Sequence, residues 1–120
     1  MRILITGGLG HIGSYFLRNL YLAIQIEELI VIDSMLTQRY ASLFNLPTGL
    51  KIRFFEKDVR DLDDKFIASL GKIHCIIHLA AITDAAGTFD KRESLFNNNL
   101  EATKTVIRIC IKNEIGRAHV

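Results

Sequence analysis

The sequence predicts an α/β fold built on a doubly wound parallel sheet, and two observations support this prediction. Short apolar runs alternate along the chain with longer segments of helical period, which is the pattern of a parallel sheet with helices on both faces. A glycine-rich turn joins the first apolar run, residues 2–6, to the first helical segment. We expect about four strands and four helices, which amounts to the N-terminal half of such a sheet.

The elements follow one another at short intervals. A first helix is predicted over residues 11–23, where apolar side chains recur at four-residue spacing and form one face. The continuously apolar run 29–32 predicts a strand buried on both faces. Further strands are predicted at 51–56 and 73–79, and further helices at 40–45, 61–70 and 91–112.

Length and composition indicate one globular domain. The chain has 120 residues, of which 49% are hydrophobic and 23% charged, and its net charge of +2 leaves no basic patch for a nucleic acid. The first apolar run is too short for a signal peptide or a membrane-spanning helix, so we expect a cytoplasmic protein with no membrane partner. Cys75 and Cys110 lack the paired spacing of a zinc or redox site, which predicts buried free thiols.

The C-terminal residues have a different interpretation. Residues 114–120 back-translate to GAG ATC GGA AGA GCA CAC GTC, which resembles a widely used short-read sequencing adapter whose next triplet is a stop codon. We therefore expect residues 114–120 to be a non-native tail from adapter read-through, and residues 1–113 to be the domain. With the tail set aside, the expected strand order 3-2-1-4 leaves one edge of the fourth strand unpaired and prone to aggregation or dimerisation.

The glycine-rich turn TGGLGHIGS, residues 6–14, has the spacing of a dinucleotide phosphate site. Gly7 allows a sharp turn, Gly10 allows backbone N–H groups to approach a pyrophosphate, and Gly13 allows the helix to pack close to the strand. The helix N-terminus adds unpaired N–H donors and a partial positive charge. The predicted phosphate-binding residues are Gly7, Gly10, His11, Ile12 and Gly13, the last three in the first turn of the helix. A purely structural turn is the alternative.

The end of the second strand favours NAD as the dinucleotide. Asp33 lies twenty positions after Gly13, where an acid accepts hydrogen bonds from the adenosine ribose hydroxyls and repels a 2′-phosphate. Arg39 follows closely enough in sequence to leave NADP as the less favoured cofactor. The alternative role for Asp33 is to cap the segment that begins at Ser34.

Together these residues resemble the extended short-chain dehydrogenase/reductases, specifically the NAD-dependent epimerase/dehydratase family that acts on nucleotide sugars. The resemblance covers residues 1–113 and rests on TGGLGHIGS, on Ile32-Asp33-Ser34, on KDVRD at 57–61, on HLAA at 78–81 and on NLEAT at 99–103. It implies a Rossmann-type fold. The pair Glu101-Ala102 departs from the small-Gly step that is common in the last motif.

The resemblance also implies roles for individual residues. Asp58 and Val59 would read the adenine edge, with a turn acid as the alternative for Asp58. The strand end Leu79, Ala80 and Ala81 would pass beneath the cofactor, with close helix–sheet packing as the alternative. Asn99 would orient the strands and the cofactor loop from the long helix, whereas Asn97 and Asn98 are expected to face solvent. Ser34 joins Asp33 at the ribose, and Thr83 and Asp84 are secondary candidates near the nicotinamide ribose and substrate.

No catalytic residue is predicted within this chain. The family removes a proton with a Tyr-x-x-x-Lys pair, and the residues four positions after the three tyrosines are Asn19, Gln25 and Phe44. His74 and His78 lie four positions apart with no third ligand, so we interpret them as structural and predict no metal site.

The resemblance implies a longer parent enzyme. That parent would oxidise a sugar hydroxyl of a nucleotide-sugar substrate with bound NAD and then return the hydride, and it is expected to be a homodimer. The alternative from another class is a non-catalytic Rossmann module that senses NAD(P).

Overall fold

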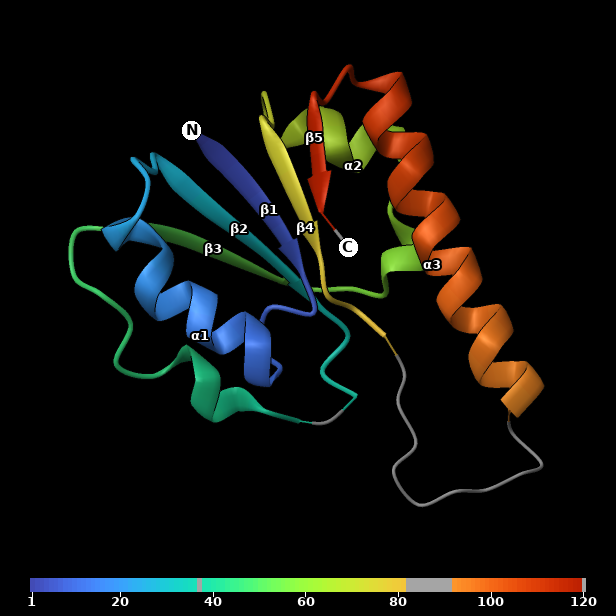
Figure 1. The fold of residues 1–120 in the computed structure, drawn as a ribbon, viewed down its shortest axis with the longest axis horizontal. Coiled ribbons are helices and arrows are strands. Elements are labelled where there is room, and N and C mark those ends of the chain that lie inside the picture. The colour runs from blue at the N-terminus through green and yellow to red at the C-terminus, as the bar shows by residue number, and fades with distance from the viewer. Residues whose placement is uncertain (37, 82–91, 120) are drawn as a thin grey trace.

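The computed structural model describes residues 1–36, 38–81 and 92–119, which are built around a parallel sheet (Figure 1). The sheet has five strands in the order β3-β2-β1-β4-β5, and every neighbouring pair is parallel. Their bounds are β1 Arg2–Thr6, β2 Glu28–Asp33, β3 Lys51–Glu56, β4 Cys75–His78 and β5 Arg117–His119. The predicted α/β class and the predicted order of the first four strands are confirmed.

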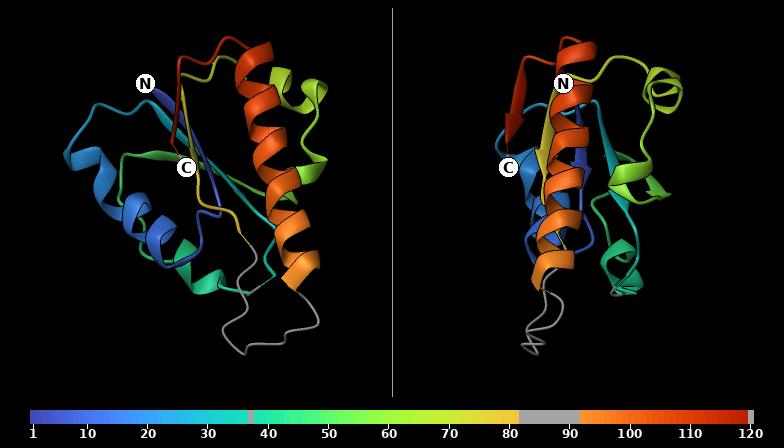
Figure 2. Two further views of the ribbon diagram at one scale, coloured as in Figure 1. Left: turned by 45° about the vertical axis from the view of Figure 1, so that its right-hand side comes forward. Right: turned by 90° about the vertical axis from the view of Figure 1, so that its right-hand side faces the viewer.

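Helices cover both faces of this sheet (Figures 1 and 2). Helix α1 (His11–Asn19) lies on one face, and α2 (Asp64–Ser69) and α3 (Arg92–Lys112) lie on the other. Single turns of 3-10 helix occur at Leu20–Leu22, Tyr40–Leu43 and Val59–Asp61. The sheet is therefore doubly wound, as the alternating sequence pattern predicts.

The central strand β1 shows why the sheet needs helices on both sides. Ile3 and Ile5 pack with Leu17 of α1, whereas Leu4 packs with Ile109 of α3 in a second cluster. All five side chains are 1% exposed or less. Because successive side chains of a strand point to opposite faces, a continuously apolar strand is stable only where both faces are covered. Each such side chain contributes about 1.5–3 kcal/mol through burial.

Most element bounds agree with the sequence prediction. Strand β3 spans residues 51–56 as predicted, and α3 is described over Arg92–Lys112, within the predicted range and with the predicted last residue. The helix predicted over residues 11–23 is interrupted, because α1 ends at Asn19 and a 3-10 turn follows. The Asn19 side-chain amide donates to the carbonyl oxygen of Tyr15 (2.9 Å) and so supplies a hydrogen-bond donor to the last turn of α1.

The edge of β4 differs from the prediction. Strand β5 pairs with β4 over Cys75–Ile77, so the expectation of an unpaired edge is wrong for these three positions. The expected aggregation or dimerisation of the chain without its tail stays a prediction. The fifth strand was not predicted because it falls in the tail that was set aside from the fold. Ile115, just before β5, is 8% exposed and joins the apolar cluster beneath α3.

Helix α3 ends in a Schellman motif with an unusual residue at its left-handed position. The Ile115 N–H donates to the Cys110 carbonyl (2.9 Å) and the Glu114 N–H donates to the Ile111 carbonyl (3.4 Å). Glu114 has a φ of 53°. Glycine is usual there because a Cβ strains this conformation, so the end of α3 is less stable than its hydrogen bonds would allow.

We predict that Glu114→Gly stabilises the chain by about 1 kcal/mol, because glycine adopts positive φ without strain. The melting temperature should rise by about 4 °C. Glu114→Ala is the matched control, since it removes the same side chain but keeps the strained Cβ. Equal stability of the two variants in denaturant unfolding would contradict the prediction.

Candidate functional site

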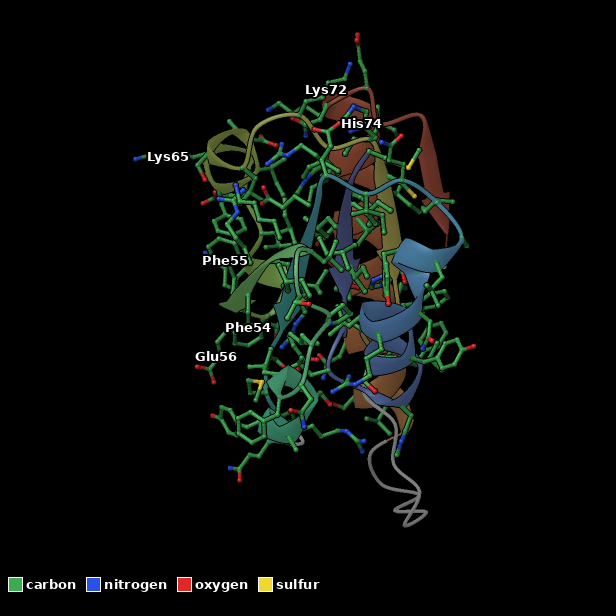
Figure 3. All side chains as sticks on the ribbon, turned by 90° about the vertical axis from the view of Figure 1, so that its left-hand side faces the viewer. Phe54, Phe55, Glu56, Lys65, Lys72 and His74 are labelled. Atoms are coloured by element: carbon green, nitrogen blue, oxygen red, sulfur yellow. The ribbon has the colours of Figure 1, made fainter. Side chains whose placement is uncertain are left out.

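The candidate residues gather at the edge of the sheet where its strands end. Thr6 pairs with Ile32 on one side and with His78 on the other, so β1, β2 and β4 end at the same level. Figure 3 shows Glu56, the last residue of β3, toward this end and His74 at the opposite end. The segments that follow these strands therefore begin side by side at the carboxyl edge of the sheet, and they contain the glycine turn, Asp33, Asp58 and Leu79–Ala81. This edge is the usual location of a ligand crevice in this fold.

The three motif glycines have different structural reasons. Gly7 has a φ of +67°, and a Cβ there would lie 2.7 Å from the backbone nitrogen of Ala80. A Cβ at Gly13 would lie 2.6 Å from the Gly7 carbonyl oxygen, so both positions need glycine for the fold itself. A Cβ at Gly10 would meet nothing closer than the same oxygen at 3.4 Å, an ordinary contact. Packing against the described residues does not require glycine at position 10.

The start of α1 presents backbone donors beside Gly10. Gly10 is the N-cap residue in an extended conformation (φ −70°, ψ −178°), and no side chain among the described residues caps the helix. The first N–H groups of an α-helix have no intrahelical acceptor, so those of His11, Ile12 and Gly13 are available to a ligand. The Ile12 side chain is 63% exposed beside them. The arrangement suits an anion.

Asp33 connects the glycine turn to the segment after β2. One carboxylate oxygen accepts the Leu9 N–H (3.0 Å) and the other accepts the Met35 N–H (2.9 Å). The second contact is the local capping role considered in the sequence analysis, and the first extends it to the phosphate turn. An ionised carboxylate can accept about four hydrogen bonds, so Asp33 keeps acceptor capacity for a ribose hydroxyl. Ser34 beside it is exposed.

Arg39 lies against the same turn. Its Nε donates to the Leu9 carbonyl (3.2 Å), and its two Nη atoms lie 3.1 and 3.2 Å from the ring nitrogens of His11. The Ser42 hydroxyl donates to the same Leu9 carbonyl (2.8 Å). The guanidinium therefore stands next to the exposed imidazole at the helix start, which places a positive charge close to Asp33.

Asp58 caps the 3-10 turn at Val59–Asp61 and forms an ion pair with Arg60. Its carboxylate accepts the Arg60 N–H (2.9 Å) and the Arg60 Nη2 (2.6 Å). These hydrogen bonds from Arg60 hold the pKa of Asp58 below its ordinary value. The backbone N–H of Lys57 donates to the Asp33 carbonyl (3.1 Å), which brings the segment that leads into Asp58 close to Asp33. Val59 is 4% exposed and belongs to the core.

A connection between Arg60 and α3 was not predicted. Arg60 Nη1 donates to the Asn98 side-chain oxygen (2.7 Å), and Asn98 is half-buried, so the expectation that it faces solvent is wrong. Asn99 is also half-buried on α3 and has an interaction of its own. No sequence pattern relates residues 60 and 98, because the contact depends on how α3 packs over the turn.

A buried polar chain lies under the glycine turn. The Thr6 hydroxyl is 2.6 Å from His78 Nδ1, and His78 Nε2 is 3.4 Å from the Thr103 hydroxyl. Thr6 is 0% exposed and His78 is 5% exposed. Burial lowers the pKa of the His78 imidazole below its ordinary value of 6.5.

His74, just before β4, and His78, its last residue, have different hydrogen-bond partners. His74 Nδ1 accepts the Arg2 N–H (3.0 Å) at the start of β1, whereas His78 contacts Thr6 at its end. Among the described residues there is no group of three potential metal ligands. Neither cysteine forms a disulfide, and Cys75 is buried as predicted, whereas Cys110 is half-buried. Thr83 and Asp84 lie outside the described residues.

The glycine turn, the acid after β2 and the HLAA strand end thus occupy one edge of a parallel sheet, and comparison with known proteins gives them a family. A model described as the 3-beta hydroxysteroid dehydrogenase/isomerase family matches residues 4–118. The chain belongs to this family. The predicted resemblance to NAD-dependent epimerases and dehydratases is confirmed by relatives and solved structures.

Individual relatives are similar over nearly the whole chain. A UDP-glucose 4-epimerase from Yersinia enterocolitica is 32% identical over 117 residues, which cover 94% of this chain and 34% of the relative. A 3 beta-hydroxysteroid dehydrogenase/Delta 5-->4-isomerase from Monkeypox virus is 28% identical over 110 residues, covering 89% of this chain and 29% of the relative. The chain therefore spans about a third of the length of these relatives.

A solved structure shows the same fold. The dTDP-glucose 4,6-dehydratase DesIV from Streptomyces venezuelae, crystallised with NAD and TYD, superposes with a TM-score of 0.78 at 29% identity. The match covers 98% of this chain and 38% of that structure. Within the described part of this chain, no helix is both long enough and apolar enough to cross a membrane.

The lowered pKa of His78 predicts a loss of stability in mild acid. In the unfolded chain His78 takes up a proton as the pH falls through about 6.5, whereas in the folded chain the buried ring is still neutral at that pH. The contribution of the neutral ring to the free energy of unfolding is therefore complete above pH 6.5 and is lost as the pH falls toward the folded pKa. His78→Asn does not titrate. The stability of the wild type relative to this variant, measured by urea unfolding from about pH 8 to about pH 5, should therefore decrease. A constant difference would contradict the assignment.

Proposed function

We propose that this chain binds NAD at the carboxyl edge of the sheet and forms the cofactor half of a nucleotide-sugar epimerase or dehydratase. The observation that carries the proposal is Gly10. Its backbone is ordinary and a Cβ there would have room among the described residues, so the described part of the fold does not explain the glycine, whereas close approach of a pyrophosphate to the helix start does. Gly7 and Gly13 build the turn, and Gly10 leaves it open to the ligand.

The surrounding residues fit each part of the dinucleotide. The N–H groups of His11, Ile12 and Gly13 would hold the pyrophosphate, and Asp33 with Ser34 would accept the adenosine ribose hydroxyls. Asp58 and Val59 would border the adenine, and Leu79, Ala80 and Ala81 would form the floor toward the nicotinamide. Asn99 would support the cofactor loop from α3. When bound, NAD would supply the hydride chemistry, and this chain would supply its orientation.

The reaction and substrate class rest on the relatives. UDP-glucose and dTDP-glucose appear in the names of a relative and of a structural neighbour, so we favour a nucleotide sugar over a steroid as the substrate of the complete protein. These proteins are named for reactions, which favours an enzyme over the sensing alternative. The 120 residues contain no Tyr-x-x-x-Lys pair, so we propose that the chain alone binds the cofactor without turnover.

The proposal includes a second copy as a partner. Along the outer face of α3, Phe96, Ile107 and Ile111 are 65%, 52% and 75% exposed, and large apolar side chains in one stripe are typical of an interface. We propose that the complete protein is a cytoplasmic homodimer that uses this stripe. The sequence contains no feature that favours a nucleic acid or a membrane as a further partner.

Gly10→Ser should separate cofactor binding from folding. Serine is a favourable N-cap residue and fits the extended backbone of position 10, so the variant should unfold at the wild-type temperature or slightly above it. Its side chain would occupy the space of the pyrophosphate, so calorimetry should show NAD affinity reduced by about a hundredfold or more.

Gly13→Ser is the matched comparison, because its Cβ would lie 2.6 Å from the Gly7 carbonyl and should destabilise the fold. Wild-type NAD affinity in a folded Gly10→Ser protein would refute the proposed site. A wild-type chain that binds no NAD would refute the proposal itself.

Asp33 and Arg39 should set the preference between NAD and NADP. The carboxylate repels a 2′-phosphate, so the wild type should bind NAD more tightly. Asp33→Asn keeps an acceptor for one backbone N–H but removes the charge. It should lower the affinity for NAD by about tenfold and leave the affinity for NADP unchanged or higher. Arg39→Ala should lower the affinity for NADP more than the affinity for NAD, since only NADP offers the guanidinium a 2′-phosphate. An unchanged NAD-to-NADP ratio in both variants, measured by calorimetry, would contradict this assignment.

A further inference from the structure

The hydrogen bonds of the buried residues Thr6, His78 and Thr103 favour one arrangement of their protons. The Thr6 hydroxyl oxygen accepts the N–H of Ala80 (3.2 Å), and the N–H of Leu79 is shared between the Thr6 carbonyl oxygen (2.9 Å) and the Thr6 hydroxyl oxygen (3.1 Å). A hydroxyl has two acceptor lone pairs and one proton. Because two N–H groups approach its oxygen, the Thr6 proton is best placed toward His78 Nδ1 at 2.6 Å.

This arrangement fixes the tautomer of His78. Nδ1 accepts and so carries no proton, which places the ring proton on Nε2, 3.4 Å from the Thr103 hydroxyl. A doubly protonated ring would direct a third N–H at a Thr6 oxygen that the N–H groups of Leu79 and Ala80 already approach. Burial of the ring at 5% exposure disfavours the charged form for an independent reason, the loss of hydration.

The hydrogen-bonded residues Thr6, His78 and Thr103 lie where the two halves of the proposed cofactor site approach each other most closely. Thr6 immediately precedes Gly7, and the Ala80 nitrogen stands 2.7 Å from the place where a Gly7 Cβ would be. The backbone just after β4 thus packs directly against the glycine turn, and the space between them would not admit a Cβ at Gly7. Thr6 fixes the two amides at this contact, His78 orients Thr6, and Thr103 connects His78 to α3.

We propose that His78, as a neutral ring protonated on Nε2, is a positioning residue for the dinucleotide. It aligns the Leu79–Ala80 backbone with the glycine turn and links that alignment to α3. The proposal rests on the proposed NAD site and adds a distinction within it. His78 affects the binding of the pyrophosphate–nicotinamide end, next to Ala80, and does not affect the binding of the adenosine end at Asp33.

Two substitutions divide the functions of the ring. His78→Asn places an amide oxygen where Nδ1 lies and can still accept from Thr6, whereas His78→Gln places its amide near Nε2 and leaves Thr6 without its acceptor. AMP and NAD serve as probes for the adenosine end and for the whole site. His78→Gln should lower the affinity for NAD by about tenfold and change the affinity for AMP by less than about twofold. His78→Asn should keep the affinity for NAD within about threefold of the wild-type value.

A merely structural role would lower stability without this selectivity. Wild-type NAD affinity in folded His78→Gln, or equal losses of NAD and AMP affinity, would overturn the proposal. Should His78→Gln fail to fold, Thr103→Val removes only the outer contact and should weaken NAD by about threefold, again sparing AMP.

The tautomer itself can be observed without any ligand. Long-range ¹H–¹⁵N correlation spectra of the wild-type chain at neutral pH should show a protonated Nε2 and a bare Nδ1 for His78. A proton on Nδ1 would overturn the inference even if NAD binds. If the wild type binds no NAD but shows the expected tautomer, the proposed function fails while the hydrogen-bond assignment stands.

Discussion

The parallel pairing of β1 with β2 on one side and β4 on the other determines where every candidate residue lies. Because the three strands run in one direction and end at one level, the segments that follow them leave the sheet together. Gly7 can then approach Ala80 closely only because neither residue interposes a large side chain. The geometry of the proposed cofactor site therefore depends on strand register before it depends on any single side chain.

The proposed site relies mainly on backbone groups and neutral contacts. The helix start offers N–H donors, and the strand end of β4 is fixed by the Thr6 hydroxyl and the His78 ring rather than by an ion pair. Charges lie on either side of this centre, with Asp33 and Arg39 at the ribose and Asp58 with Arg60 at the turn after β3. A neutral centre with charged margins suits a ligand whose phosphates are recognised by oriented dipoles and whose adenosine is recognised by an acid.

The sequence predicted what depends on local pattern and missed what depends on long-range packing. The bounds of β3 and the glycine turn follow from periodicity and spacing, which the chain carries locally, and the order of the first four strands follows from the fold class that they indicate. Three features did not follow. Met35 and Gln38 adopt positive φ in the segment after β2 although neither is glycine, Arg60 reaches Asn98 across 38 positions, and the tail supplies β5. His78 was interpreted as structural, and only its contact with Thr6, 72 positions away, relates it to the phosphate turn.

The measurement that tests the central claim most directly is a titration of the ¹⁵N-labelled chain with NAD, followed through its backbone amide resonances. The account predicts saturable shifts concentrated at Gly10, His11, Ile12 and Ala80, with the amides of Lys72 and His74 at the opposite end of the sheet unchanged. Shifts that do not saturate, or that spread evenly over both ends of the sheet, would contradict a dinucleotide site at the carboxyl edge.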